Sequence, residues 1–284
     1  MHPELNAQQA GFDEQLNAED RQEHGDYLYL QRTLKEVAGL DLSAYKEKQM
    51  LRRLRGFVGR KGLSSLRELA DAVRIDPQMR QQLTDYLAIN VTEFFRNPER
   101  FAELAGKVLP ALRSRYDSLR VWSAGCSTGP EAYSVAILLE EMEPGSWTRH
   151  RVIGTDIDRE ALAEARLGIF SDDRLREVSE ERRRRFFTAL GDGRWQVSDA
   201  IRRYVKFALH DLLKDPYPAQ QHLILCRNVI IYFTEEAKDY VFAKLAASLA
   251  PGGYLLLGST ETIFYPGRYG LKTAGPFLYV RTEE

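Results

Sequence analysis

The fold is decided by a strand–loop–helix stretch at residues 121–134, which reads VWSAGCSTGPEAYS. Its apolar start predicts a buried strand, and Pro130 suits the first position of the helix that follows. Gly125 and Gly129 in the connecting loop allow the backbone to come close to a ligand. Open α/β sheets bind ligands beyond the carboxyl ends of their strands, where the strand order reverses. We therefore expect a binding site at this loop.

The ligand class follows from the loop spacing and from Glu131. The pattern is G-x-x-x-G, whereas the dinucleotide fingerprint is G-x-G-x-x-G, and the lysine of a phosphate-binding loop is absent. A carboxylate in the first helical turn repels phosphate but suits a cation, such as the amino group of a methionine moiety. The pattern favours S-adenosylmethionine over a nucleotide phosphate. A second interpretation, that Glu131 only complements the helix dipole, stays open.

Strand and helix patterns alternate from residue 119 to the end of the chain. Strands are expected at 119–123, 151–155, 204–208, 222–226, 253–258 and 277–281, and helices at 130–142, 159–165 and 235–249. Such alternation predicts an open α/β sheet with a mainly parallel core. The last two strands are joined by a loop too short for a crossover helix, which predicts an antiparallel closing strand.

Other regions of the chain depart from this alternation. Residues 1–25 are polar without an apolar period, and we expect a disordered tail there. Residues 26–89 show helical apolar spacing, which predicts an all-helical N-terminal domain before the α/β domain at 90–284. A charged helix at 179–188 and a hairpin around Gly191-Asp192-Gly193 predict a small β-subdomain inserted at about 168–206.

Glycines and serines mark the helix ends expected in the N-terminal domain. Gly39 is expected to end the first helix, and Gly59 and Gly62 to break the second. Ser64 or Ser65 is a natural cap for the third.

Composition excludes several function classes. The 284 residues carry 40 basic and 41 acidic side chains, a formal net charge of −1, so no nucleic-acid partner is expected. The two cysteines, Cys126 and Cys226, lack zinc-site spacing and are too few for a disulfide scaffold, so we expect reduced thiols and no metal. The sequence shows neither an apolar run of about 20 residues nor a signal peptide. These features indicate a cytoplasmic protein without membrane insertion.

Polar side chains follow two further predicted strands. Asp156 ends the second strand, where an acid commonly accepts ribose hydroxyls, whereas Asp158 has the pattern of a helix cap. Arg227 and Asn228 interrupt an apolar run at the expected carboxyl end of a later strand. They should meet a ligand or a partner, because burying unsatisfied polar groups is costly. A structural turn at Asn228 is the alternative.

The boundary between the two predicted domains reads NVTEFFRNP, residues 90–98. Linkers do not usually carry Phe-Phe beside Arg, and domain junctions commonly form the walls of clefts. This segment is therefore a candidate wall of the site.

Four motifs in order resemble the CheR family of chemotaxis-receptor glutamate methyltransferases, over about residues 27–284. They are NVTEFFR at 90–96, WSAGCSTGPEAYS at 122–134, TDID at 155–158 and CRNVIIYF at 226–233. The resemblance implies a Rossmann-like S-adenosylmethionine-dependent methyltransferase sheet, an all-helical N-terminal domain and a small inserted antiparallel β-subdomain. It also implies methyl transfer to glutamates on the cytoplasmic helices of chemoreceptors, with S-adenosylhomocysteine as product.

The resemblance further implies which residues act. It places cofactor contacts at Asn90, Thr92, Arg96, Glu131, Asp156, Asp211, Leu212, Arg227 and Asn228. It places Arg96 and Tyr232 beside the transferred methyl, as catalytic residues. A glutamate, with an ordinary pKa of about 4.3, is already ionised near neutral pH, so the transfer needs no general base. The enzyme has to align oxygen, methyl and sulfur and to exclude water.

Two surfaces are candidates for receptor contacts. Residues 46–61 hold seven cationic side chains and one acidic one. A charge run is usually a solvated face, but beside an acidic receptor bundle Lys48, Arg52, Arg53 and Arg55 are expected to steer the receptor. The inserted hairpin is a few residues shorter than in relatives that grip a receptor's C-terminal tail. We therefore expect an enzyme that needs no tail tether.

Two other functions are alternatives to this one. A methyltransferase acting on nucleic acid would hold a flipped base with an Asn-Pro-Pro-Tyr-like turn, and residues 227–230 contain no such prolines. A binding module that senses the cofactor without catalysis is the other alternative. The presence of Arg96, Asp156 and Tyr232 together argues against a dead enzyme.

Overall fold

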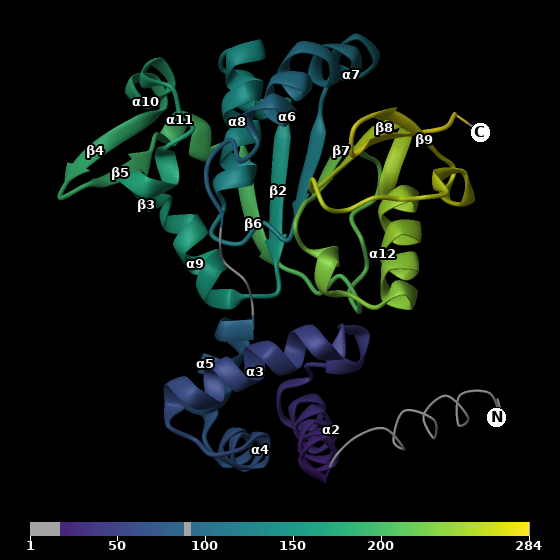
Figure 1. The fold of residues 1–284 in the computed structure, drawn as a ribbon. Helices are drawn as coiled ribbons and strands as arrows, with labels where there is room; N and C mark the ends of the chain where they lie inside the picture. Colours follow the sequence, from purple (N-terminus) through teal and green to yellow (C-terminus); the bar gives the residue numbers. More distant parts are fainter. Residues whose placement is uncertain (1–17, 88–91, 284) are drawn as a thin grey trace. The chain divides into compact units, whose positions relative to one another are not determined.

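The computed structural model describes residues 18–87 and 92–283. The chain divides into two units (Figure 1). One is helical and consists of the N-terminal region up to Leu87 together with Tyr232–Thr234, and the other contains the remaining residues. Within the described ranges, no helix combines the length and the apolar character that a membrane span requires.

Residues 18–87 of the helical unit form four helices and one 3₁₀ turn. They are α2 (Ala18–Ala38), η1 (Leu42–Ala44), α3 (Glu47–Lys61), α4 (Leu66–Ile75) and α5 (Pro77–Leu87). Leu30, Leu54 and Leu69, one from each of three helices, are fully buried in its core. Two predicted helix ends are confirmed. Gly39, with φ of +64°, follows α2, and the Ser65 side chain caps α4 by accepting from the Glu68 N–H at 3.1 Å.

Two expectations for this unit are wrong. The tail was expected to reach residue 25, but α2 begins at Ala18. Its first turns carry polar side chains that bind α3 through polar contacts, such as His24 Nδ1 to Glu47 Oε1 at 2.8 Å, so no apolar period revealed them. Gly59 does not break α3, which runs on to Gly62, because an exposed helical glycine costs only about 1 kcal/mol. The tail at residues 1–17 lies outside the described residues.

The second unit contains a seven-stranded sheet. Its strands, in sheet order, are β6 (Val205–Leu209), β2 (Arg151–Asp156), β1 (Arg120–Ala124), β7 (Gln221–Cys226), β8 (Leu249–Leu257), β10 (Leu278–Arg281) and β9 (Leu271–Gly275). The first five are parallel to one another, and β10 is antiparallel to β8, as the short connection predicted. Strand β9 was expected to be loop. It is an edge strand whose central side chains are exposed, so it has no apolar alternation to reveal it.

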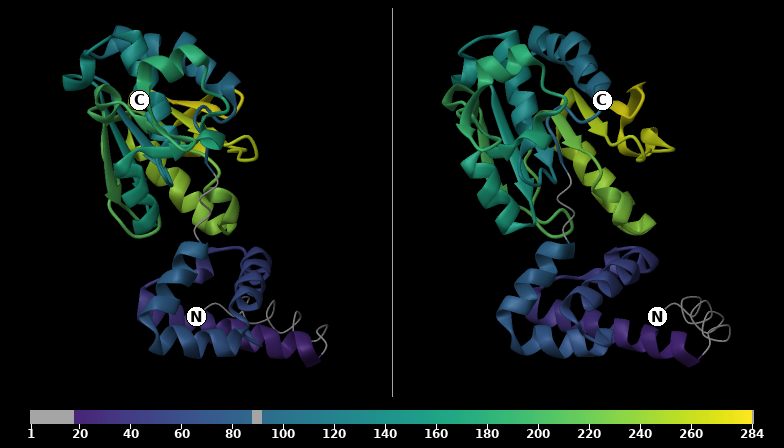
Figure 2. Two further views of the ribbon diagram at one scale, coloured as in Figure 1. Left: turned by 90° about the vertical axis from the view of Figure 1, so that its left-hand side faces the viewer. Right: turned by 60° about the vertical axis from the view of Figure 1, so that its left-hand side comes forward.

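Helices cover the sheet on both sides, and Figure 2 shows strands between α9 and α12. The described helices of this unit outside the β-subdomain are α6 (Pro98–Glu103), α7 (Leu109–Arg115), α8 (Pro130–Met142), α9 (Arg159–Leu167) and α12 (Glu235–Ser248). It also has the π-helical turn η2 (Leu104–Val108) and the 3₁₀ turns η3 (Ser146–Thr148) and η6 (Pro266–Tyr269), and the 3₁₀ turn η5 (Ile230–Tyr232) ends in a residue assigned to the helical unit. Every residue of β7 is buried, as a central strand covered on both faces requires.

A three-stranded antiparallel sheet forms the expected β-subdomain, drawn apart from the large sheet in Figure 1. Its elements are β3 (Ile169–Ser171), η4 (Asp172–Leu175), α10 (Glu180–Phe186), β4 (Phe187–Gly191), β5 (Arg194–Val197) and α11 (Asp199–Arg202). The predicted hairpin joins β4 to β5. The charged helix ends two residues earlier than expected, because the buried Phe187 begins β4.

Candidate active site

The strand order reverses between β1 and β7. From β1 the sheet grows outward through β2 and β6, whereas from β7 it grows in the other direction through β8. Because both strands are parallel, the loop at residues 125–129 and the pair Arg227–Asn228 leave the sheet at the same edge. This edge is where ligands bind in open α/β sheets.

Glycines let the loops after β1 and β7 touch. Gly125 has a φ of +76°, and a Cβ added to it would lie 2.3 Å from Val229 Cγ2, too close for any side chain. Gly129 has a φ of +95°, and its added Cβ would lie 2.9 Å from Phe207 Cζ. Both glycines are therefore required by backbone angle and by close packing.

Arg227 links its own motif to two others. Its Nη1 lies 3.3 Å from Glu131 Oε2, and its Nη2 donates to the Arg96 carbonyl at 2.8 Å and to Asn97 Oδ1 at 2.6 Å. Ser123 Oγ donates to Glu131 Oε1 at 2.7 Å. The side chains of Arg227 and Glu131 are 3% and 12% exposed, so this ion pair is largely removed from water. The buried Arg227 side chain is therefore bound by other residues of this chain. Glu131 does more than complement the helix dipole, because it also pairs with Arg227.

The segment that contains Arg96 is held in a strained conformation. Phe95 and Asn97, on either side of Arg96, have φ values of +54° and +62°. The Phe95 N–H donates to Ser134 Oγ at 2.9 Å, and the Phe94 N–H donates to the Arg174 carbonyl at 3.0 Å. A bulky residue with positive φ is costly, and such strain gathers at functional sites.

Backbone strain is concentrated at this edge of the sheet. Among the described residues, seven residues other than glycine have a positive φ. Three of them, Phe95, Ser127 and Asn228, lie in the motifs, and a fourth, Asn97, directly follows the first motif. Asn228 has a φ of +60°, a left-handed conformation that a turn at this position also uses.

Asp156 retains acceptor capacity for a ligand. Its Oδ2 accepts from the Ser127 N–H at 2.7 Å and its Oδ1 from the Asp158 N–H at 3.0 Å. The Ile157 N–H also donates to this carboxylate, and a carboxylate offers about four lone-pair positions, so about one remains. Burial raises the pKa of Asp156, against the effect of these hydrogen bonds. Asp158 caps α9 by accepting from the Glu160 and Ala161 N–H groups at 2.8 and 3.0 Å, which confirms its structural role.

Asp211 and Leu212 follow β6, beside Asp156. The link is the N–H of His210, which donates to the Asp156 carbonyl at 2.9 Å. Asp211 Oδ1 accepts from the Leu213 N–H at 2.9 Å, and Leu212 is buried. Three aromatic rings pack under this corner with centroids 5.2 to 5.4 Å apart, those of Trp122, His210 and Tyr217.

The residues present fit S-adenosylmethionine. Three carboxylates, from Glu131, Asp156 and Asp211, stand at one edge of the sheet and suit a ligand that carries an amino group and a ribose diol, although Glu131 and Asp211 also pair with Arg227 and Lys214. Two buried nitrogen atoms, His210 Nδ1 and Arg227 Nε, have no hydrogen-bond partner among the described residues. Such polar atoms are normally satisfied by a ligand or water.

Four further predicted site residues come from the first and the last motif. Asn90 lies outside the described residues, and the carbonyl of the half-buried Thr92 accepts from Arg174 Nη1. Arg96 is half-buried in the methyltransferase unit. Tyr232 belongs to the helical unit, where its carbonyl accepts from the Lys46 N–H at 2.8 Å.

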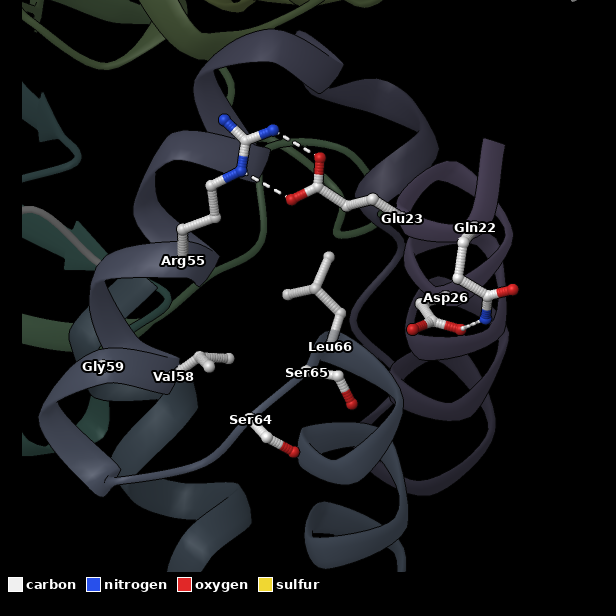
Figure 3. A pocket seen from close by; sticks show the side chains of 9 residues that line it. All are labelled: Gln22, Glu23, Asp26, Arg55, Val58, Gly59, Ser64, Ser65 and Leu66. Carbon is white, nitrogen blue, oxygen red and sulfur yellow. Dashed lines mark hydrogen bonds and ion pairs between the residues drawn. The ribbon is translucent and has the colours of Figure 1, made fainter. Parts of the chain in front are cut away.

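The four expected receptor-binding cations differ in their surroundings. Lys48 and Arg52 are exposed on α3. Arg53 is half-buried, donates to the Tyr86 carbonyl and lies 5.3 Å from the centroid of the Tyr86 ring, and burial lowers its pKa. Arg55 forms a two-pronged ion pair with Glu23, visible in Figure 3. Two of the four are therefore already bound within the chain.

The Arg55–Glu23 pair borders a pocket of about 580 Å³ in the helical unit. Figure 3 shows its lining side chains, which are Gln22, Glu23, Asp26, Arg55, Val58, Gly59, Ser64, Ser65 and Leu66. None of them belongs to the four motifs, so the pocket is no part of the candidate active site.

Sequence reasoning missed two residues that hold the site together. Glu261 accepts hydrogen bonds from the loop after β7, and Arg174 binds the segment at 92–94 through its side chain and its carbonyl. A signal for Glu261 existed, since it is an acid shortly after a predicted strand, as Asp156 is. Arg174 lies in the charged insertion, where nothing in the sequence distinguishes it from its neighbours.

Comparison with known proteins assigns the family. The model of the CheR methyltransferase SAM-binding domain matches residues 90–272, and that of the CheR methyltransferase all-alpha domain matches residues 25–88. A chemotaxis protein methyltransferase of Listeria monocytogenes is 40% identical over 259 residues, which cover 90% of this chain and 97% of that protein.

Relatives with lower sequence identity are chemotaxis protein methyltransferases as well. A chemotaxis protein methyltransferase of Vibrio parahaemolyticus is 36% identical over 84% of this chain and 89% of its own length. Chemotaxis protein methyltransferase 1 of Pseudomonas aeruginosa is 31% identical over 92% of this chain and 98% of its own length. With the Rossmann-like sheet, the helical domain and the inserted β-subdomain all in place, the chain belongs to the CheR family, the S-adenosylmethionine-dependent methyltransferases that esterify glutamate side chains of chemoreceptors.

Proposed function

We propose that the carboxyl edge of β2, β1 and β7 holds the cofactor of this methyltransferase. The proposal rests on Arg227, which joins three motifs far apart in the sequence through Glu131, Asn97 and the Arg96 carbonyl. The proposed cofactor contacts are Thr92, Arg96, Glu131, Asp156, Asp211, Leu212, Arg227 and Asn228, with Asn90 added from the family resemblance.

Each carboxylate has a separate task in this proposal. Bound S-adenosylmethionine supplies an electrophilic methyl group on a positively charged sulfur. Asp156 uses its remaining acceptor capacity for a ribose hydroxyl, since backbone N–H groups already hold its orientation. Glu131 receives the amino group of the methionine moiety while Arg227 keeps it fixed. Asp211 and Leu212 border the adenine.

Arg96 and Tyr232 serve the acceptor glutamate. Arg96 orients the substrate carboxylate, and Tyr232 helps to close the site against water. A carboxylate needs no general base, so the rate depends on alignment. We expect Arg96→Ala to lower kcat/KM on the order of a hundredfold and Tyr232→Phe to lower it only a few-fold. Turnover close to wild type in both variants would show that these residues do not act on the acceptor.

The reaction is tested by following the transferred methyl group. The full chain is incubated with methyl-labelled S-adenosylmethionine and a receptor cytoplasmic fragment, and the labelled product is then treated with mild base. Release of the label as methanol is expected, because glutamyl methyl esters hydrolyse readily. A base-stable label would indicate a different acceptor, such as a nucleic acid base. Cofactor binding without any transfer would support a binding module instead.

The partner is proposed to be the cytoplasmic helices of a chemoreceptor, met in the cytoplasm. The exposed Lys48 and Arg52 support an acidic protein partner, whereas Arg55 is already paired with Glu23 and Arg53 is half-buried. The short hairpin between β4 and β5 supports docking without a tail tether. A receptor fragment and the same fragment without its C-terminal tail are therefore expected to be methylated at equal rates. A large loss on removing the tail would refute the absence of a tether.

A further inference from the structure

Glu261 lies beyond the end of β8 and is almost completely buried, at 4% exposure. Its carboxylate accepts four backbone hydrogen bonds. Oε2 takes the N–H groups of Asn228 and Gly258, both at 2.7 Å, and Oε1 takes those of Val229 and Ile230, both at 3.0 Å. Three of these donors are consecutive residues of the loop after β7.

This arrangement joins the ends of two neighbouring strands. Cys226 of β7 is paired with Leu257 of β8, so the loops that follow them start side by side. Gly258 allows the close approach, because a Cβ there would lie 2.5 Å from Glu261 Oε2 and 2.8 Å from the Asn228 nitrogen. Glu261 thus fixes the loop that begins with Arg227.

The fixed loop carries two contacts on which the site depends. Arg227, directly before the bound N–H groups, reaches Glu131 and the Arg96 segment. Val229, inside the bound run, packs against Gly125 of the loop after β1. A shift of this loop would therefore disturb the loop after β1 and the loop after β7 together.

We propose that Glu261 is the positioning residue of the cofactor site, holding the Arg227–Ile230 loop in its binding conformation. The inference deepens the proposed function and rests on its assignment of the cofactor to this edge. Glu261 does not touch the cofactor, because its roughly four lone-pair positions are already taken by four N–H groups.

A carboxylate is needed here rather than an amide. A buried charge without a cation beside it is costly unless hydrogen bonds compensate it, and four charge-assisted N–H bonds do so. Glutamine has a single acceptor oxygen, and its NH₂ group would face backbone donors. Glu261→Gln therefore leaves at least one loop N–H unsatisfied and pushes the loop away.

The test compares Glu261→Gln with Glu143→Gln in the full chain. Glu143 also accepts hydrogen bonds in this unit, but from Arg113 and His150, which precedes β2 at the opposite edge of the sheet. We expect Glu261→Gln to weaken S-adenosylhomocysteine binding, measured by calorimetry, at least about tenfold. Binding would require the displaced loop to return to a conformation that buries an unsatisfied N–H, and the free-energy cost of that burial corresponds to at least such a factor. KM for the receptor fragment should change little, and the control should bind as wild type does.

Equal S-adenosylhomocysteine affinity in wild type and a folded Glu261→Gln protein would overturn the proposal, and so would an equal loss in both variants. If Glu261→Gln does not fold, the proposal is tested instead by the rate of amide hydrogen exchange in the wild-type protein without cofactor. Slow exchange at Asn228, Val229 and Ile230 supports the proposal, and fast exchange there refutes it. Failure of the proposed function has a different signature, because wild type itself would then bind no S-adenosylhomocysteine.

Discussion

Acid should destabilise the methyltransferase unit through two buried histidines, well before most carboxylates are protonated. His150 Nδ1 accepts the N–H of Leu119 at 3.1 Å, and His222 Nδ1 accepts the N–H of Arg120 at 3.0 Å. The two rings flank β1 and hold consecutive residues at its start. A ring nitrogen that accepts a hydrogen bond cannot carry a proton, so both imidazoles must stay neutral in the folded protein.

Burial is the main cause that lowers both pKa values to about 4. The nearby positive charges of Arg113 and Arg149 add to the effect at His150, and that of Arg120 adds to it at His222. The rings are 0% and 3% exposed, so solvent screens these effects little.

The direction in which pH changes the free energy of unfolding follows from comparing the folded and unfolded states. An unfolded histidine has a pKa of about 6.5, so between pH 6.5 and 4 the unfolded chain binds two protons that the folded chain does not. The free energy of unfolding therefore falls as the pH falls through this range and is unaffected by these groups above it. At pH 5 each histidine removes about 2 kcal/mol relative to pH 8. Together they remove about 4 kcal/mol, against a typical total of about 5–15 kcal/mol.

The assay is urea unfolding at pH 8, 6.5 and 5, followed by tryptophan fluorescence. All three tryptophans, Trp122, Trp147 and Trp195, lie in the methyltransferase unit, so the signal reports on the unit that contains both histidines. The matched variant is His150→Asn with His222→Asn, whose amide oxygens can accept the same N–H groups but do not titrate.

The double variant should be less stable than wild type at pH 8 but should lose much less stability between pH 8 and pH 5. Asp156 and Glu261 have raised pKa values and act in the opposite direction, but they are present in both proteins. Parallel stability curves for the two proteins would refute the reasoning.

Two further predictions concern the site and the partner surface. Gly125→Ala should destabilise the methyltransferase unit by about 2–4 kcal/mol and weaken S-adenosylhomocysteine binding, because its φ is positive and its Cβ would collide with Val229. The control Gly106→Ala meets nothing within 4 Å, and an equal loss in both variants by urea unfolding would contradict the collision. Lys48→Glu with Arg52→Glu should slow methylation of the receptor fragment about tenfold at low salt and far less at 0.5 M salt. An effect that salt does not change would exclude electrostatic steering.

The elements could be predicted well where glycine or proline marks their ends and an apolar pattern marks their buried face. Helix α8 has the predicted bounds, because Gly129 and Pro130 mark its start and its side chains are apolar almost throughout. The start of α2 was missed because its first turns bind α3 through Glu23 and His24, and such polar contacts leave no apolar stripe in the sequence. Strand β9 was missed for a related reason, since an exposed edge strand lacks alternation.

The site residues that the sequence could identify are those at fixed offsets from strand ends. Asp156 and Arg227 both follow buried apolar runs, and the sheet brings them to the same edge. The residues that sequence reasoning missed act on backbone atoms. Arg174 and Glu261 hold their loops through N–H and C=O groups, which every residue has, so no side-chain pattern specifies their targets.

The geometry also changes what the motifs mean. Glu131 was expected to bind a cationic ligand, yet it already pairs with Arg227. Backbone N–H groups around Asp156 take most of the acceptor capacity of its carboxylate. Much of the bonding of the motif residues is therefore directed at one another. A site built in this way needs little reorganisation when a ligand enters, which lowers the free-energy cost of binding. The strained backbone at Phe95 and Asn97 fits the same logic, because only a densely bonded surrounding can hold it.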